Sequence, residues 1–263
     1  MPVLQRDLFS TYFEESGSGE VLVLICGLSA DLQAWRFQVA ELSKSYRVIC
    51  FDNRGAGRSS APDEPYSIGQ MADDLAALMD HLSVSKARVL GWSMGGVIAQ
   101  SYALAHPARV EQLLLLGTFT APDGYLHAAI SNWVNIRRSE MPYEHIVRHV
   151  ARMIYSPSLA NNPKAYEAFI QAMLANPYRQ TDQGFFRQAE ALLSYKQPSL
   201  RELKTPTAVL VGEHDQLTPK YMSEELAAAI PGSSLQVLPG AHSGFVEFPE
   251  QYNQVLLRTL CAT

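Results

Sequence analysis

The stretch ARVLGWSMGGVIAQSYAL, residues 87–104, combines the patterns of a buried strand, a tight turn and a helix. Residues 88–90 predict the strand, Gly91 and Gly95 flank Ser93 at minus two and plus two, and helical character begins at Val97. The small flanking residues allow a sharp turn, and the following helix directs its N–H groups and partial positive charge toward the serine. The pattern therefore presents Ser93 as a nucleophile, although a glycine-rich turn with an incidental serine gives the same letters.

Apolar runs on both sides of this stretch predict the rest of a sheet. Further runs of strand character cover residues 8–13, 21–26, 46–52, 110–117, 207–212 and 234–240. Segments with helical spacing lie between them, at residues 32–43, 68–82 and 219–230. Strands that alternate with helices predict an α/β fold with a doubly wound, mostly parallel sheet.

The pattern changes between residues 121 and 198, where helical segments rich in aromatic residues, Met and Arg replace the strand-like runs. Prolines divide this region into about four short helices, because proline ends a helix or starts the next. They are Pro142, Pro157, Pro163, Pro177 and Pro198. We therefore expect one core made of residues 1–120 and 199–263, with residues 121–198 inserted as a helical cap, or lid.

Composition narrows the classes of partner. The net charge of -5 comes without an acidic or basic block, which argues against nucleic acid or an anionic membrane surface and favours a small-molecule partner. Cys26, Cys50 and Cys261 lack CxxC spacing, so we expect small buried side chains rather than disulfides or a zinc site. No secretory leader or bilayer-spanning stretch is evident, which predicts a cytoplasmic protein. The sequence carries no signal for the oligomeric state.

A serine nucleophile needs a base for its proton and an acid that orients the base. Two later loops offer these groups. VGEHDQLTP places Asp215 just past the strand that ends at Gly212, and LPGAHSGFVEFPE places His242 just past the strand that ends near Pro239. The carboxyl ends of parallel strands meet at one edge of a sheet, so Ser93, Asp215 and His242 are expected to come together there.

These motifs together resemble the α/β-hydrolase family. GWSMGG matches the nucleophile elbow, GEHDQLTP the acid loop, PGAHSGFVEFP the histidine loop, and FDNRGAGRSS the loop after the fourth strand. The segments DLQAW and LGWSMGG, with the chain length, look most like small carboxylesterases and lactonases of the 3-oxoadipate enol-lactonase type. The resemblance implies an eight-stranded sheet and a serine hydrolase, without metal or cofactor, that cleaves a small ester or lactone through an acyl-enzyme.

One position departs from the family pattern. Many relatives carry His-Gly where the oxyanion loop begins, and this chain has Cys26-Gly27-Leu28. The chemistry there needs a backbone N–H, which we assign to Leu28, acting with the N–H of Met94. Backbone donors survive a change of side chain, so Cys26 bears on substrate class more than on mechanism. A catalytic role for the Cys26 thiol is disfavoured, because nothing cationic lies beside it in sequence.

Other candidates for each catalytic role are weaker. Asp123 follows the strand ending at Gly117 and is the alternative acid, but the DQLTP segment favours Asp215. Glu213 and His214 are expected to face solvent, and the other histidines lie on predicted helices or their ends: His81, His106, His127, His145 and His149. Arg54 and Arg58 are expected to hold loop backbone rather than bind an anion.

Large apolar side chains suggest a substrate pocket. We expect Trp92, Trp133 and Phe245 to line it, and Tyr155, Phe185 and Phe186 are further candidates for which packing inside the cap is the alternative. A polar stripe in the cap could steer a substrate carboxylate, but a solvated helix face is the preferred interpretation. The stripe consists of His145, Arg148, His149 and Arg152.

Two rival functions use the same triad. A ligand receptor with slow turnover would bind a partner protein through the cap, and a perhydrolase or carbon–carbon bond hydrolase would differ in the pocket. Dehalogenases and epoxide hydrolases need a carboxylate at the elbow, where this chain has Ser93, so they are disfavoured.

Overall fold

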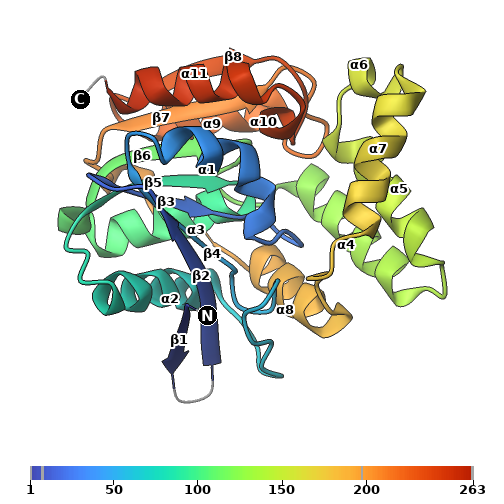
Figure 1. Cartoon of the computed structure of the whole chain (residues 1–263), viewed down its shortest axis with the longest axis horizontal. Helices are drawn as coiled ribbons and strands as arrows, with labels where there is room; N and C mark the ends of the chain where they lie inside the picture. The colour runs from blue at the N-terminus through green and yellow to red at the C-terminus, as the bar shows by residue number, and fades with distance from the viewer. Residues whose placement is uncertain (1, 7–8, 197, 262–263) are drawn as a thin grey trace.

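The computed structural model describes residues 2–6, 9–196 and 198–261 of the 263-residue chain. An eight-stranded sheet forms its centre, in the order β1-β2-β4-β3-β5-β6-β7-β8 (Figure 1). The β1–β2 and β2–β4 pairs are antiparallel, and all the others are parallel. The strands are β1 (Val3–Arg6), β2 (Phe9–Ser16), β3 (Val21–Ile25), β4 (Arg47–Phe51), β5 (Ala87–Trp92), β6 (Val110–Leu116), β7 (Thr207–Gly212) and β8 (Ser234–Leu238). This order confirms the predicted α/β class and mostly parallel sheet.

Eleven α-helices occur in the described part of the chain. They are α1 (Arg36–Leu42), α2 (Ile68–His81), α3 (Met94–Ala105), α4 (Gly124–Arg138), α5 (Tyr143–Ile154), α6 (Pro157–Ala160), α7 (Pro163–Leu174), α8 (Asp182–Leu193), α9 (Lys220–Ala229), α10 (Gly244–Glu247) and α11 (Pro249–Leu260). Short 3-10 turns cover Leu32–Trp35, Pro107–Arg109 and Leu200–Glu202.

Side chains alternate between the two faces of the sheet, as strand geometry requires. On β3, Val23 and Ile25 join the hydrophobic cluster that includes side chains of α2, α3 and α9. Leu22 and Leu24 face the opposite cluster, which includes side chains of α1 and α11. Because both faces are covered, the central strands consist mostly of apolar residues.

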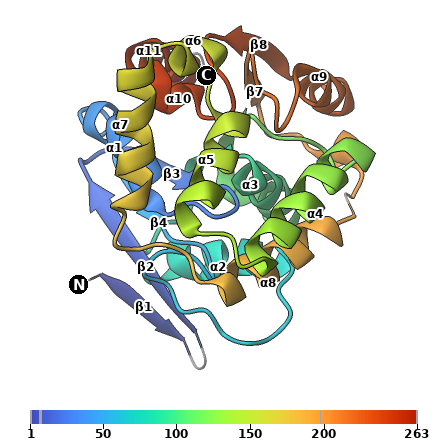
Figure 2. The same ribbon diagram turned by 90° about the vertical axis from the view of Figure 1, so that its right-hand side faces the viewer.

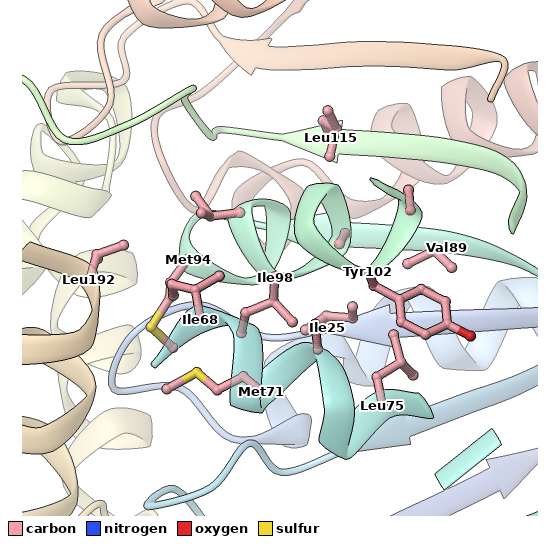
Figure 3. Close-up of a cluster of buried hydrophobic side chains, with 14 of the residues drawn as sticks. Ile25, Ile68, Met71, Leu75, Val89, Met94, Ile98, Tyr102, Leu115 and Leu192 are labelled. Carbon is pink, nitrogen blue, oxygen red and sulfur yellow. The ribbon is translucent and has the colours of Figure 1, made fainter. Parts of the chain in front are cut away.

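Helix α3 fixes the end of β5 against the rest of the core. Met94 and Ile98 lie in one cluster with Ile68 and Met71 of α2, and Leu192 of α8 reaches the same cluster from the insertion (Figure 3). All five side chains are almost fully buried. The first turn of α3, which directly follows Ser93, is therefore held by apolar packing on the side of α2.

Local sequence signals explain where several helices begin. Ser67 accepts from Gln70 N while the Gln70 side chain accepts from Ser67 N, which forms a capping box for α2. The side chains of Asp123 and Thr181 accept backbone N–H groups at the starts of α4 and α8. Prolines open α6 and α7, as the prediction for this region supposed.

Helices α4 to α8 form an insertion between β6 and β7, called the cap below. The cap lies beside the sheet at one end of the molecule (Figure 1), and α4, α5 and α7 face the viewer in Figure 2. About four cap helices were expected, whereas the described residues of the cap form five. Ser156 and Pro157 start the additional four-residue helix α6, which is too short to show a helical period in the sequence. The boundaries at residues 120 and 198 stay a prediction.

Two other features differ from the sequence-based expectations. β1 was not predicted, because its four residues are mostly exposed and show no apolar face. Cys261 is exposed, whereas Cys26 and Cys50 are buried as expected. Among the described residues, no helix is long and apolar enough to cross a membrane.

Candidate active site

Ser93 lies at a strained turn between β5 and α3. Its backbone has φ 56° and ψ -124°, a conformation that L-residues rarely adopt. The turn brings the backbone of residues 91–95 very close together and against the end of β3, which leaves no room for side chains at its glycines. A Cβ atom on Gly91 would lie 2.3 Å from Gly95 O, and one on Gly95 would lie 2.3 Å from Ile25 O. The glycines on both sides of Ser93 are therefore required by packing as well as by the turn.

Asp215 and His242 follow β7 and β8, and the structure brings them into contact. His242 Nδ1 lies 2.8 Å from Asp215 Oδ2, and both side chains are almost completely buried. A hydrogen bond to this oxygen places the proton on Nδ1 and leaves Nε2 free to accept one. Gly117, with φ 50°, directly follows β6 and lies beside the pair. A Cβ atom there would lie 3.3 Å from Asp215 Oδ2 and 3.4 Å from His242 Nδ1.

The carboxylate of Asp215 is held by its own loop. Oδ1 accepts the N–H groups of Leu217 at 2.9 Å and Thr218 at 2.8 Å. The fully buried hydroxyl of Thr218 lies 2.8 Å from Oδ2, 2.9 Å from Gly117 O and 3.1 Å from His242 Nδ1. These donors fix the direction in which the carboxylate points.

The loop after β3 lies against the serine. A Cβ atom on Gly27 would be 2.9 Å from Ser93 Cβ, so glycine is needed for this close approach. Asn53 Nδ2 donates to Cys26 O at 2.9 Å, which fixes the end of β3. The Cys26 thiol donates to Asp31 O at 3.2 Å and is inaccessible to solvent, and burial raises its pKa well above the usual value. Cys26 is therefore a structural side chain.

A cavity of about 450 Å³ lies between this site and the cap. Its wall includes Gly27, Leu28, Ser93 and His242, together with apolar residues from α4, α5 and α7. Examples of the last are Ile130, Val147, Val150, Ile154 and Met173. The wall of the cavity is thus mostly apolar, with a hydroxyl and an imidazole among its few polar groups, as is common in small-molecule sites.

Two of the three predicted pocket residues line this cavity. Trp92 and Trp133 do so, and Tyr155 lines it as well. The assignment of Phe245 to the pocket is wrong: its fully buried ring lies 4.7 Å from that of Trp35 and 4.9 Å from that of Trp92, outside the cavity wall. Phe245 therefore supports Trp92 from behind, and Trp92 Nε1 donates to His242 O at 2.9 Å.

Phe185 and Phe186 pack inside the cap instead of lining the cavity. Phe185 is fully buried, with its ring 5.0 Å from Trp133 and 5.7 Å from Phe186. Both residues therefore follow the alternative prediction for these aromatics, which was packing within the cap.

The competing candidates are engaged elsewhere. Asp123 caps α4 and accepts from Tyr221 at 2.6 Å. Arg54 makes a buried pair with Asp74, at 2.7 and 2.8 Å, so it holds structure as expected. Glu213 and His214 are exposed.

The polar stripe of α5 also serves structure. Arg148 pairs with Glu144 and Glu167, and Arg152 donates to Gln216 Oε1 at 2.9 Å. Arg148 and Arg152 of the stripe are therefore engaged by other side chains. Within residues 2–6, 9–196 and 198–261, no group of three or more His, Cys, Asp or Glu side chains is placed to hold a metal ion.

Sequence reasoning missed several residues that support the site. Thr218 stands three positions after Asp215 in the acid loop, and that spacing is the one signal that could have found it. Thr118 donates to Ser93 O at 2.7 Å, and Gln188 donates to Arg54 O at 2.8 Å. Their partners are backbone atoms of distant segments, for which the sequence holds no local pattern.

The fold and the strand-end site define an α/β hydrolase. The family model for the alpha/beta hydrolase fold matches residues 20–249, so the chain belongs to this family. The sheet order, the elbow between β5 and α3, and the cap between β6 and β7 are the structural features that accompany this match.

Curated and solved relatives cover nearly the whole chain. A protein named putative carbamate hydrolase RutD from Azorhizobium caulinodans is 32% identical over 98% of this chain and 97% of its own length. The 3-oxoadipate enol-lactonase 2 of Acinetobacter baylyi is 30% identical over 89% of this chain and 86% of its own. A thermophilic esterase structure from Thermogutta terrifontis is 30% identical, with a TM-score of 0.84, and the match covers 96% of this chain and 93% of that one.

Proposed function

We propose that the protein hydrolyses a small carboxylic ester or lactone through an acyl-enzyme on Ser93. The observation that carries this proposal is the buried 2.8 Å contact between His242 and Asp215, at a cavity that also opens onto the strained Ser93. A strained elbow keeps the hydroxyl clear of the sheet, and an oriented imidazole accepts its proton. The esterase and enol-lactonase names of two relatives support the same bond class.

The reaction follows from these positions. Ser93 Oγ attacks the carbonyl carbon while His242 Nε2 takes the hydroxyl proton, and Asp215 stabilises the imidazolium that forms. The backbone N–H groups of Leu28 and Met94 donate to the oxyanion. His242 then gives its proton to the leaving oxygen. In the second half, it activates a water that attacks the acyl-enzyme and releases the acid.

The cavity supports the proposed substrate class. Its volume of about 450 Å³ suits a small molecule, and its largely aliphatic and aromatic wall favours an apolar acyl or alcohol part. The N–H groups proposed for the oxyanion hole lie at the end that contains Ser93. The substrate carbonyl is therefore expected there, with the rest of the molecule extending toward Val150 and Ile154 of α5.

The test is covalent labelling combined with turnover. Intact mass after incubation with a fluorophosphonate should rise by one adduct in the wild type and stay unchanged in Ser93→Ala. Short p-nitrophenyl esters and simple lactones should then be turned over by the wild type alone. Folded wild type that neither labels nor turns over these substrates would refute the proposed function.

The same assay separates the alternatives. Rapid labelling with almost no turnover would favour the ligand receptor, whereas peracid formation with added peroxide or cleavage of a vinylogous diketone would favour the perhydrolase or carbon–carbon bond hydrolase. A carbamate belongs in the panel because of the name of the Azorhizobium relative, and the same serine mechanism applies to its carbonyl.

A further inference from the structure

Gln188 of α8 joins the cap to the loop that follows β3. Its side chain is completely buried and makes three hydrogen bonds to three separate segments. Nε2 donates to Arg54 O at 2.8 Å, and Oε1 accepts from Gln180 Nε2 at 2.9 Å and from Ser29 N at 3.4 Å. The amide thus links α8, the loop after β4 and the residue that follows Leu28.

The neighbours of Gln188 determine which way its amide points. The carbonyl of Arg54 can only accept, so it needs the NH₂ end, and this turns Oε1 toward the N–H of Ser29. Gln180 Nε2 also donates to Gly55 O at 2.8 Å, while Gln180 Oε1 is buried without a partner. The reverse orientation of either amide would place an oxygen against a backbone carbonyl.

Ser29 needs such a partner. It has φ 65°, the left-handed conformation that a non-glycine residue adopts only when its surroundings hold it there. Leu28 directly precedes it, so the direction of the Leu28 N–H depends on the same short turn, closed by Ala30 N donating to Gly27 O at 3.4 Å. A second cap residue, Asn176, donates to Asp31 Oδ2 at 2.6 Å at the far side of this turn.

The position of Gln188 relative to the core is itself fixed. Gly184 lies one helical turn earlier on the same face of α8, and a Cβ atom there would be 2.0 Å from Gly55 O. Helix α8 therefore lies directly against the core backbone, and Leu192, one turn after Gln188, packs in the cluster that holds Met94. Three successive positions on one helix face thus contact the core.

We propose that Gln188 is a positioning residue for the oxyanion loop. Through its hydrogen bond with Ser29 N, the position of α8 against the core controls how well the loop stabilises the transition state. This inference rests on the proposed function and adds a residue that touches no reacting atom. Removing the acceptor at Ser29 N lets the strained turn relax and displaces the Leu28 N–H. Since oxyanion donors act in the transition state, the effect should fall on kcat more than on KM.

Two substitutions at this position separate the possible roles. Gln188→Leu removes every hydrogen bond of the amide. Gln188→Glu keeps an acceptor for Ser29 N but loses the donor to Arg54 O. Gln183→Leu is the matched control, because Gln183 lies on the same helix, is exposed and donates to Ala61 O. Steady-state kinetics with p-nitrophenyl acetate are measured well below the melting temperature of each variant.

We expect Gln188→Leu to lower kcat about tenfold or more with little change in KM, as a partial loss of one oxyanion donor. Gln188→Glu should keep a kcat clearly above that of the leucine variant, and Gln183→Leu should match the wild type. A leucine variant with wild-type kcat would overturn the proposal, and so would a loss of kcat in Gln183→Leu as large as that in Gln188→Leu. If Gln188→Glu does not fold, Gln188→Leu is judged alone and should have lost most of the wild-type kcat. If Gln188→Leu does not fold, Gln188→Glu is judged alone and should have kept most of it.

The failure of this inference differs from failure of the proposed function. Wild type that takes no fluorophosphonate label and turns over no ester sinks the proposed function. Active, labelled wild type together with unimpaired Gln188→Leu sinks only the role of Gln188.

Discussion

Asp215 Oδ2 and His242 Nδ1 lie 2.8 Å apart although 27 positions separate the two residues in sequence. β7 and β8 pair in parallel, with Gly212 opposite Leu238, so the loops that leave the two strands start side by side. The pairing register therefore determines that these two side chains meet.

The first prediction concerns this contact. Asp215→Asn keeps the shape of the side chain but lets its amide donate to Nδ1, which favours the wrong tautomer of His242. We expect kcat for p-nitrophenyl esters to fall by on the order of 10³- to 10⁴-fold with the fold intact. Steady-state kinetics and circular dichroism check this. Near-normal turnover in a folded variant would argue for another acid, with Asp123→Asn as the control that should retain activity.

Thr218 gives a milder test of the same site. Thr218→Val removes a fully buried hydroxyl that lies within hydrogen-bonding distance of Asp215 Oδ2 and Gly117 O, with almost no change of volume. A hydrogen bond to a charged group contributes about 1.5–3 kcal/mol, so the free energy of unfolding should fall by about that amount. Turnover should fall less than in Asp215→Asn. Urea unfolding and kinetics measure the two effects, and an unchanged unfolding free energy would contradict the account.

The candidate residues of this site were predicted from the sequence, but the residues that hold them in place were not. Ser93, Asp215 and His242 follow apolar strands, and strand ends are visible in sequence because burial on both faces produces continuous apolar runs. Thr118 and Gln188 donate to backbone atoms of other segments, which leave no pattern, and Thr218 is signalled only by its spacing from Asp215. Phe245 was misplaced because it lies on α10, a four-residue helix whose direction the sequence does not determine.

The same reasoning explains the fold. β3 to β8 were predicted because they are apolar or half-buried within a parallel sheet, whereas β1 exposes most of its side chains at the sheet edge and looks like a loop. In the cap, Ser156 and Pro157 begin α6 through capping, and four residues are too few to display a period of 3.6.

A third prediction concerns the glycines of the elbow. In Gly95→Ala the new methyl group would lie 2.3 Å from Ile25 O and 2.6 Å from Cys26 O, and these atoms belong to backbone that cannot move freely. We expect the free energy of unfolding to drop by about 1–3 kcal/mol or more. Gly124→Ala is the control, because no atom lies within 4 Å of its added Cβ, and its effect should stay within about 0.5 kcal/mol. Equal stability of the two variants in urea would refute the packing argument.

The fourth prediction concerns the three cysteines. Cys261 is exposed, whereas Cys26 and Cys50 are buried, and burial raises the pKa of both buried thiols. At pH 8 both remain protonated and inaccessible, so iodoacetamide should modify Cys261 alone in the folded protein and all three after unfolding in guanidinium. Peptide mass spectrometry identifies the modified sites. Rapid modification of Cys26 in folded protein would show that the loop after β3 opens.

The backbone contact between Gly184 and Gly55 bears on how caps can be exchanged within this family. A cap transplanted from another member would bring its own residue to position 184, and any side chain there would collide with the carbonyl of Gly55. Such a chimaera would hold α8 away from the core and leave Ser29 without its acceptor. An engineer who wishes to change the substrate range should therefore exchange the cap and the loop after β4 together.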